Sequence, residues 1–127
     1  MNDEFENKII TEVGDCLYNM GVYPNIVGFM NMIYAVISVV KSGNPNYPTC
    51  KAYIDAGKRV NRSPSSIERS MRTLIFKCEN SHTFDKLNDF IGAPVYHNQP
   101  FSAGELISIF ALKYMKNQKS AEKAPIF

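Results

Sequence analysis

Residues 53–78 read YIDAGKRVNRSPSSIERSMRTLIFKC, and this stretch decides the fold because it predicts two short helices joined by a tight turn. Ser63 followed by Pro64 is a helix start. The serine hydroxyl can accept a hydrogen bond from a free amide of the first turn, and proline at the first helical position loses no hydrogen bond. After this start, apolar residues recur with the period of an α-helix, at Ile67, Met71, Leu74, Ile75 and Cys78.

The opposite face of the second helix is polar, with Ser65, Ser66, Glu68, Arg69, Arg72 and Thr73. An amphipathic surface helix that meets only water is the alternative interpretation, and for an arbitrary helix it is the more common one. The surrounding charge favours a binding role. A pair of helices with a basic, serine-rich second member suits a helix-turn-helix that enters the major groove of DNA. Over residues 51–72, Lys51, Lys58, Arg59, Arg62, Arg69 and Arg72 outweigh Asp55 and Glu68, for a net charge of +4.

The length and composition predict one domain. The 127 residues are 45% hydrophobic and 20% charged, which is ordinary for a soluble globular protein with a real core. The overall charge of +2 says little, but its distribution is uneven, because residues 1–20 are acidic whereas the middle of the chain is basic. This asymmetry is a weak indication of an anionic partner that binds in one orientation.

No pattern predicts a metal site, a cofactor or an enzyme. Cys16, Cys50 and Cys78 lack the paired spacing of metal ligands and are expected to be small buried residues in a reducing compartment. His82 and His97 are lone loop histidines with no nucleophile or acid at a recognisable spacing. The chain also lacks a signal peptide, and its longest apolar run is too short to span a bilayer, so a cytoplasmic protein with no membrane contact is expected.

Helical periodicity and capping signals divide the chain into six helices. The expected ranges are 3–20, 26–41, 49–60, 63–79, 84–91 and 102–117. Ser102 and Glu105 have capping-box spacing at the start of the last helix, and residues 118–127 are expected to be a flexible tail. No stretch shows strand alternation. The sequence therefore predicts one compact all-α domain, residues 1–127, in which the third and fourth helices form a helix-turn-helix at about residues 49–79.

Two of these helices carry further expectations. The second is apolar over much of its circumference, with Met32 and Val39 partly outside the main face; it is either central to the core, which is the more common explanation, or shared with a partner. In the third helix, Gly57 is a place where another helix could approach closely. The apolar positions expected in the third helix are Cys50, Tyr53, Ile54 and Gly57.

With the helices in this order, the sequence resembles the DNA-binding effector domain at the C-terminus of the stage-zero sporulation master regulator, a response regulator of endospore-forming bacteria. The resemblance runs from about Ile9 to Lys116 and includes a glycine-rich opening at the second helix. The matching positions are Gly21-Val22, Ile26, Gly28-Phe29, Ala35-Val36, Thr49, Tyr53, Pro100 and Glu105-Leu106-Ile107, together with Ser65-x-Ile67-Glu68-Arg69-x-Met71-Arg72-x-x-Ile75 on the family signature S-x-V-E-R-A-I-R-x-x-I.

The resemblance implies a six-helix fold and sequence-specific binding to short promoter boxes, often in tandem, that regulates transcription. Glu68 and Arg69 fall on the family's base-contacting pair, and Arg72 falls on a further DNA-contacting arginine. Arginine can bridge O6 and N7 of guanine, and glutamate can accept from N4 of cytosine. Ser66 stands where the family has an arginine, so one base contact is expected to be shortened or lost.

The same resemblance places other residues near the DNA backbone and implies partners. Phosphate contacts set register and salt dependence without reading sequence. Double-stranded DNA is the expected partner, with RNA polymerase and a homodimer, formed through the second helix or on tandem DNA sites, as further possibilities. The residues expected at phosphates are Lys58, Arg59, Arg62, Ser63 and Ser65.

Ser66 and the apolar Ile33-Tyr34 depart from the family pattern and keep a second function open. Val27 replaces the opening's basic residue, Ile33-Tyr34 replaces an Arg-Glu pair, and no receiver domain precedes the helices, so aspartyl phosphorylation within the chain is not expected to be the switch. A DNA-binding transcriptional regulator is the first hypothesis. The alternative is a protein-interaction module of the same fold that modulates a full-length regulator or RNA polymerase, and an enzyme is the least favoured class.

Overall fold

The computed structural model describes the backbone of residues 3–81, 84–92 and 102–123, and the side chains of residues 4–78, 85–92 and 102–115. Within these ranges the chain forms six helices and no strand, as predicted. The first five begin and end within two residues of their expected positions. The helices are α1 (Asp3–Asn19), α2 (Val27–Ser42), α3 (Thr49–Val60), α4 (Pro64–Ser81), α5 (Phe84–Ile91) and α6 (Ala103–Lys123).

The sixth helix starts as predicted but is longer than expected. Its capping box is formed, because the Ser102 amide donates to Glu105 Oε1 and the Glu105 amide donates to Ser102 Oγ, both at 3.1 Å. The predicted end near Asn117 is wrong, since α6 continues to Lys123. Residues 118–123 read QKSAEK and contain no glycine or proline, so no residue there opposes the helix. Residues 124–127 lie outside the described residues, as do His82 and His97.

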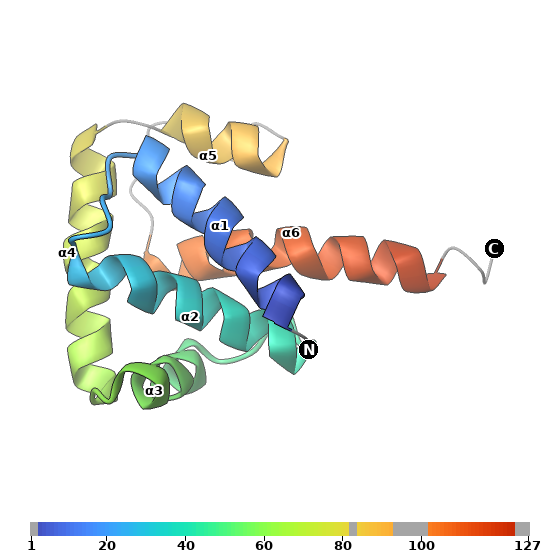
Figure 1. Cartoon of the computed structure of the whole chain (residues 1–127), viewed down its shortest axis with the longest axis horizontal. Helices are drawn as coiled ribbons and strands as arrows, with labels where there is room; N and C mark the ends of the chain where they lie inside the picture. The colour runs from blue at the N-terminus through green and yellow to red at the C-terminus, as the bar shows by residue number, and fades with distance from the viewer. Residues whose placement is uncertain (1–2, 82–83, 93–101, 124–127) are drawn as a thin grey trace.

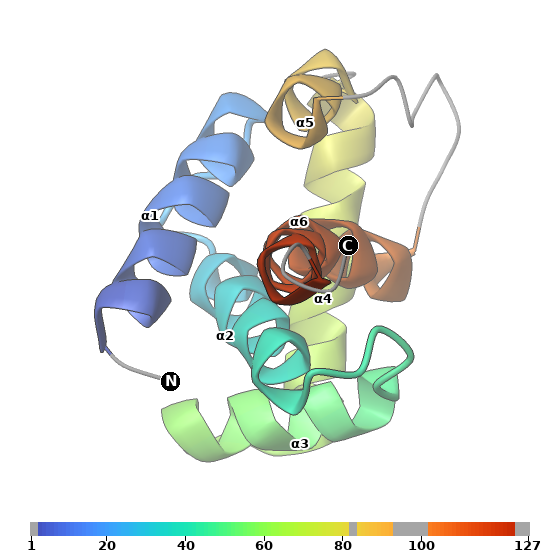
Figure 2. The ribbon, with the colours of Figure 1, turned by 90° about the vertical axis from the view of Figure 1, so that its right-hand side faces the viewer.

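The centre of the molecule is formed by α2 and α6. Helix α2 contacts α1, α3, α4 and α6. Figure 2 looks along α6 from its C-terminal end and shows the other helices arranged around it. In Figure 1, α4 stands along one edge of the molecule, and α1, α2 and α6 extend from one side of it. Fully buried side chains of the resulting core include Leu17, Ile33, Ile37, Leu106 and Phe110.

The apolar circumference of α2 is explained by the core. Met32 and Val39, which were expected partly outside its apolar face, are buried, so that expectation is wrong. Ile33 is also fully buried, and Tyr34 is half-buried against the core. The reason is that four helices surround α2, which leaves little of its circumference to solvent. Ile33 and Tyr34, the residues that suggest a dimer contact on this helix, therefore pack within one chain.

Helix α3 packs through small side chains rather than large ones. Ala52, Ala56 and Gly57 are buried at successive turns on the face toward the core, beside Tyr53. Ile54 is 41% exposed, so its predicted place on the apolar face is wrong. Small residues let the axes of packed helices lie close together. The sequence pattern predicts the wrong packing face, because large apolar residues dominate a hydrophobic periodicity and alanines contribute little to it.

The cysteines differ in their surroundings. Cys16 and Cys78 are buried, as predicted, and burial raises the pKa of the Cys16 thiol to about 12. Cys50 is exposed, so the prediction that it is buried is wrong. It lies in the first turn of α3, at the end of the helix.

Helix α4 is held against α2 by a close backbone approach. Ile67, Met71 and Leu74 are fully buried on its inner face. At Gly28 of α2, an added Cβ atom would lie 2.6 Å from the carbonyl oxygen of Ser70. Next to this contact, the buried Asn31 donates from Nδ2 to Ser70 Oγ at 3.0 Å. The orientation of α4 is thus fixed by both backbone contact and a buried hydrogen bond.

This packing predicts opposite effects of alanine at two helical glycines. Gly28→Ala forces a methyl group onto the α4 backbone and should lower the free energy of unfolding by roughly 1–3 kcal/mol. Gly14→Ala is the matched control in α1. Its Cβ would meet the Phe29 ring at 3.4 Å and Ile33 Cδ1 at 3.7 Å, both ordinary contacts, and alanine should stabilise the helix by up to about 1 kcal/mol. Urea unfolding of both variants checks this, and equal stabilities would contradict the close approach.

Candidate nucleic-acid interface

The turn between α3 and α4 is tight and has a defined backbone. Asn61 ends α3 in the left-handed conformation, with φ 58° and ψ 51°, and the Arg62 amide donates to the Gly57 carbonyl oxygen at 2.9 Å. A Cβ atom at Gly57 would collide with the Arg62 carbonyl oxygen. The glycine therefore makes room for the turn, and not for another helix as the sequence suggested. Residues 61–63 fix the angle between the two helices.

The start of α4 is capped as predicted. The Ser66 amide donates to Ser63 Oγ at 3.2 Å, which satisfies one of the free amides of the first turn. The Ser63 hydroxyl still has its own proton to donate. Arg62 and Ser65 are exposed beside it, and Lys58 is exposed on the last turn of α3. These four candidate phosphate contacts therefore lie around one turn with their polar groups accessible.

The outer face of α4 presents the predicted base-contacting residues to solvent. Glu68, Arg69 and Arg72 are all exposed. The side chains of Glu68 and Arg72 are 55% and 73% exposed and form an ion pair at 3.3 Å, one helical turn apart. Within the described part of the chain, no ion pair involves Arg69. Ser66 is half-buried at the edge of this face. In Figure 1, no other helix lies beyond α4 at its edge of the molecule.

One exposed residue of α4 was not predicted as part of this face. Phe76 is 66% exposed, although it is a large apolar side chain in a helix whose inner face is fully packed. Neither the apolar nor the polar face predicted for this helix includes Phe76. Its spacing is the signal that could have found it, since it lies seven residues after Arg69 and four after Arg72. Such spacing puts the three side chains on one side of a helix.

Arg59 is engaged differently from the other predicted phosphate contacts. Its guanidinium donates to both carboxylate oxygens of Glu6, at 3.0 and 2.9 Å, and lies 5.1 Å from the centre of the Tyr34 ring. Lys41 pairs with the same carboxylate. Hydrogen bonds from Arg59 and then Lys41 lower the pKa of Glu6 to about 2. The structure therefore brings Arg59 together with α1 and α2.

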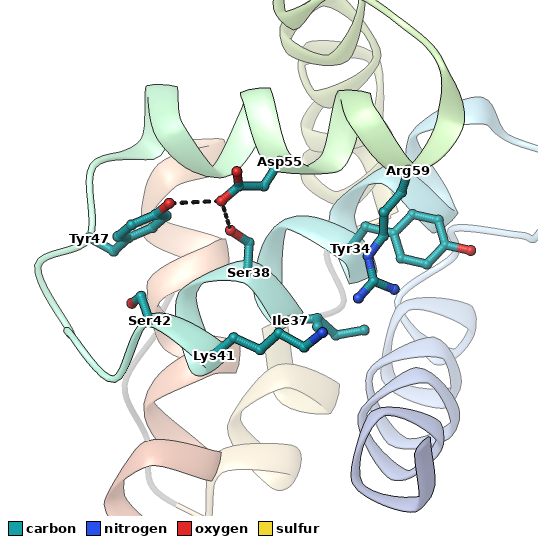
Figure 3. A pocket seen from close by; sticks show the side chains of 8 residues that line it. All are labelled: Tyr34, Ile37, Ser38, Lys41, Ser42, Tyr47, Asp55 and Arg59. Carbon is teal, nitrogen blue, oxygen red and sulfur yellow. Dashed lines mark hydrogen bonds between the residues drawn. The ribbon is translucent and has the colours of Figure 1, made fainter. Parts of the chain in front are cut away.

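An open pocket of about 420 Å³ lies between α2 and α3 (Figure 3). Asp55 accepts hydrogen bonds from Ser38 Oγ at 2.5 Å and from the Tyr47 hydroxyl at 2.7 Å, and these bonds lower the pKa of its carboxyl. The charged groups at this pocket are already paired inside the chain. Its contacts thus tie α2 to α3. The pocket is lined by Tyr34, Ile37, Ser38, Lys41, Ser42, Tyr47, Asp55 and Arg59.

The described residues form neither a metal site nor a membrane span. Among them, no group of three or more histidine, cysteine, aspartate and glutamate side chains is arranged to hold a metal ion. None of the helices built from these residues combines the length and the apolar character that crossing a membrane requires.

Packed helices that leave one basic helix exposed along an edge are typical of helical DNA-binding domains. A family model described as "Sporulation initiation factor Spo0A C terminal" matches residues 13–114, which is most of the chain. The chain belongs to this family, a family of DNA-binding regulatory domains of sporulation and not of enzymes. This confirms the resemblance found in the sequence. Neither a curated protein nor a solved structure matches the chain.

The low pKa of Glu6 predicts a pH-dependent contribution to stability. Because the folded-state pKa is lowered from 4.5 to about 2, the carboxylate stabilises the fold above pH 4.5, and this contribution disappears as pH falls through 2. Over that range the wild type should lose about 1 kcal/mol more stability than Glu6→Gln, after allowing for solvent screening. Chemical denaturation at several pH values measures this. Glu4→Gln, an exposed neighbour in α1, is the control; parallel curves for Glu6→Gln and wild type would contradict the ion pair.

Proposed function

We propose that the chain is a sequence-specific DNA-binding transcriptional regulator that acts in the cytoplasm and reads a short promoter box with α4 in the major groove. The observation that carries the proposal is the exposure of Glu68, Arg69 and Arg72 on a helix whose back is fixed in the core. Arginine can form two hydrogen bonds to one guanine, and glutamate can accept from cytosine N4. Membership of a DNA-binding regulatory family supports this proposal.

In this proposal α3 and α4 are the two helices of a helix-turn-helix, and the turn between them lies over the DNA backbone. Lys58 and Arg62 supply positive charge there, and the hydroxyls of Ser63 and Ser65 supply short hydrogen-bond donors. Such contacts hold the protein in register on the duplex without reading bases. Ser63 can do this while it caps α4, because the cap uses its oxygen as acceptor and leaves its proton free.

Two of the predicted contacts have a smaller part in the proposal. The Ser66 side chain is short and half-buried. It can therefore reach a base only if the first turn of α4 lies deep in the groove. Arg59 has two strong hydrogen bonds to Glu6. A phosphate that takes Arg59 has to displace that carboxylate, whereas Lys58 and Arg62 have no such competitor among the ion pairs of the described residues.

A second candidate is a module that binds a full-length regulator or RNA polymerase. The apolar residues of α2 no longer favour it, because Ile33 is buried. Another observation does: the Tyr18 and Tyr23 rings are 56% and 52% exposed and lie 5.1 Å apart, and Val27 nearby in the sequence is 68% exposed. Exposed aromatic residues are enriched at protein interfaces. Gel filtration with purified RNA polymerase tests this candidate, and co-elution that Tyr18→Ala abolishes would support it.

Selection from a pool of randomised duplexes, followed by fluorescence anisotropy, tests the main proposal. We expect enrichment of a defined sequence and binding that weakens steeply with added salt, because phosphate contacts release counterions. A chain that enriches no sequence and shows no salt-dependent affinity for any duplex would falsify the proposal.

Two variants should separate base contacts from phosphate contacts. Arg69→Ala should lose roughly 1–3 kcal/mol of binding free energy on the selected duplex and little on random DNA. Lys58→Ala should weaken both duplexes alike and reduce the salt slope by about 1. Lys58 is a better choice than Arg59 for the phosphate variant, because Arg59→Ala also removes one of the two partners of Glu6. If both variants show the same ratio of specific to random binding, the assignment of roles is wrong.

A further inference from the structure

The outer face of α4 extends beyond the arginines to an exposed aromatic ring. Arg69 lies opposite the middle of the buried stripe, and Phe76 follows it by one heptad, which leaves the two side chains within about 20° of each other around the helix. They are about 10 Å apart along the axis. The ring is 66% exposed, in a position where the helix needs no apolar residue for its own packing.

The spacing of this face matches a known mode of reading DNA. In homeodomains the long third helix contacts the major groove through residues spaced i, i+3, i+4 and i+7. The exposed residues Arg69, Arg72, Thr73 and Phe76 of α4 have the same spacing. Helix α4 has 18 residues, so its middle turns can lie in the groove without its end leaving the domain. The axial distance from Arg69 to Phe76 corresponds to about three base pairs.

Resting on the proposed function, we propose that Phe76 is a specificity-determining residue that packs on the 5-methyl group of a thymine, about three base pairs from the guanine read by Arg69. The thymine methyl is the apolar feature of the major groove, and aromatic side chains are among its partners. The exposed arginines beside Phe76 make this face complementary in charge to an anionic duplex. They therefore favour DNA over an apolar protein as the partner of this ring. The contact buries a ring that water otherwise surrounds.

The test uses the full chain and the duplex that it selects from the randomised pool. Each thymine of that duplex is replaced in turn by deoxyuridine, which removes only the 5-methyl group, and affinities are measured for wild type and Phe76→Ala. We expect Phe76→Ala to bind the thymine duplex roughly tenfold more weakly. Replacing one thymine near the Arg69 guanine by deoxyuridine should weaken the binding of wild type several-fold. The same replacement should leave the binding of Phe76→Ala unchanged.

Two further variants control for folding and for the loss of a surface apolar residue. Phe76→Leu keeps an apolar side chain and should fall between wild type and Phe76→Ala. Leu112→Ala removes a similarly exposed residue, 52% exposed, from α6 and should bind like wild type. By circular dichroism, Phe76→Ala should unfold at the same temperature as wild type, since the exposed ring contributes little to the core.

The outcomes separate this inference from the function on which it rests. If wild type selects a duplex but Phe76→Ala binds it equally well, the ring faces another partner and the inference is overturned while the function stands. The inference is also overturned if every deoxyuridine effect persists in Phe76→Ala, because the methyl contact then belongs to another residue. If wild type enriches no sequence, the proposed function fails first, and the assignment of Phe76 fails with it.

Discussion

The place of α4 depends on the absence of one side chain. At Gly28 the backbone of α2 lies so close to the Ser70 carbonyl that no Cβ atom fits between them. The buried Asn31 amide then bonds the Ser70 hydroxyl, which itself donates to the Ile67 carbonyl oxygen at 2.7 Å. A side chain that must reach a base edge has to be held to a fraction of an ångström. A helix fixed at its middle, with its core residues fully buried, provides such a support for the residues on its other face.

The charges of the chain are divided between a structural group and an exposed group. Glu6 uses two of the positive charges, Arg59 and Lys41, to join α1 to α3 and α2. The arginines of α4 are left toward solvent. Glu6 of the acidic first helix therefore neutralises cations of α2 and α3, and not those of α4. Among the ion pairs of the described residues none uses Arg69, whose charge lies on the face that the proposal assigns to DNA.

Most of the architecture could be predicted because its signals are local. The Ser63-Pro64 start and the Ser102–Glu105 capping box each rest on hydrogen bonds within a few residues, and the structure shows both. The packing face of α3 could not be predicted in this way, because it depends on which helix lies opposite. Alanines have no hydrophobic signal strong enough to outweigh Ile54, yet they define the close face.

The candidate site shows the same limit. The exposure of Glu68, Arg69 and Arg72 followed from the helical period alone. The pairing of Arg59 with Glu6 joins residues 53 positions apart, and no local pattern indicates it. The exposure of Phe76 is harder to predict, because a large aromatic residue in an amphipathic helix is more often buried than exposed. Its spacing from Arg69 and Arg72 places it on the outer face of α4, where its ring is 66% exposed.

The exposed ion pair between Glu68 and Arg72 has a kinetic consequence for a protein that searches a long duplex. An exposed pair of this kind contributes little to stability, so it opens readily and frees the arginine. In the proposed function, the Glu68 carboxylate repels the phosphates at every DNA site. This repulsion is offset only where a base amino group donates a hydrogen bond to the carboxylate. In this proposal, Glu68 would thus shorten the dwell time on unrelated sequence, and the chain would exchange some total affinity for faster scanning.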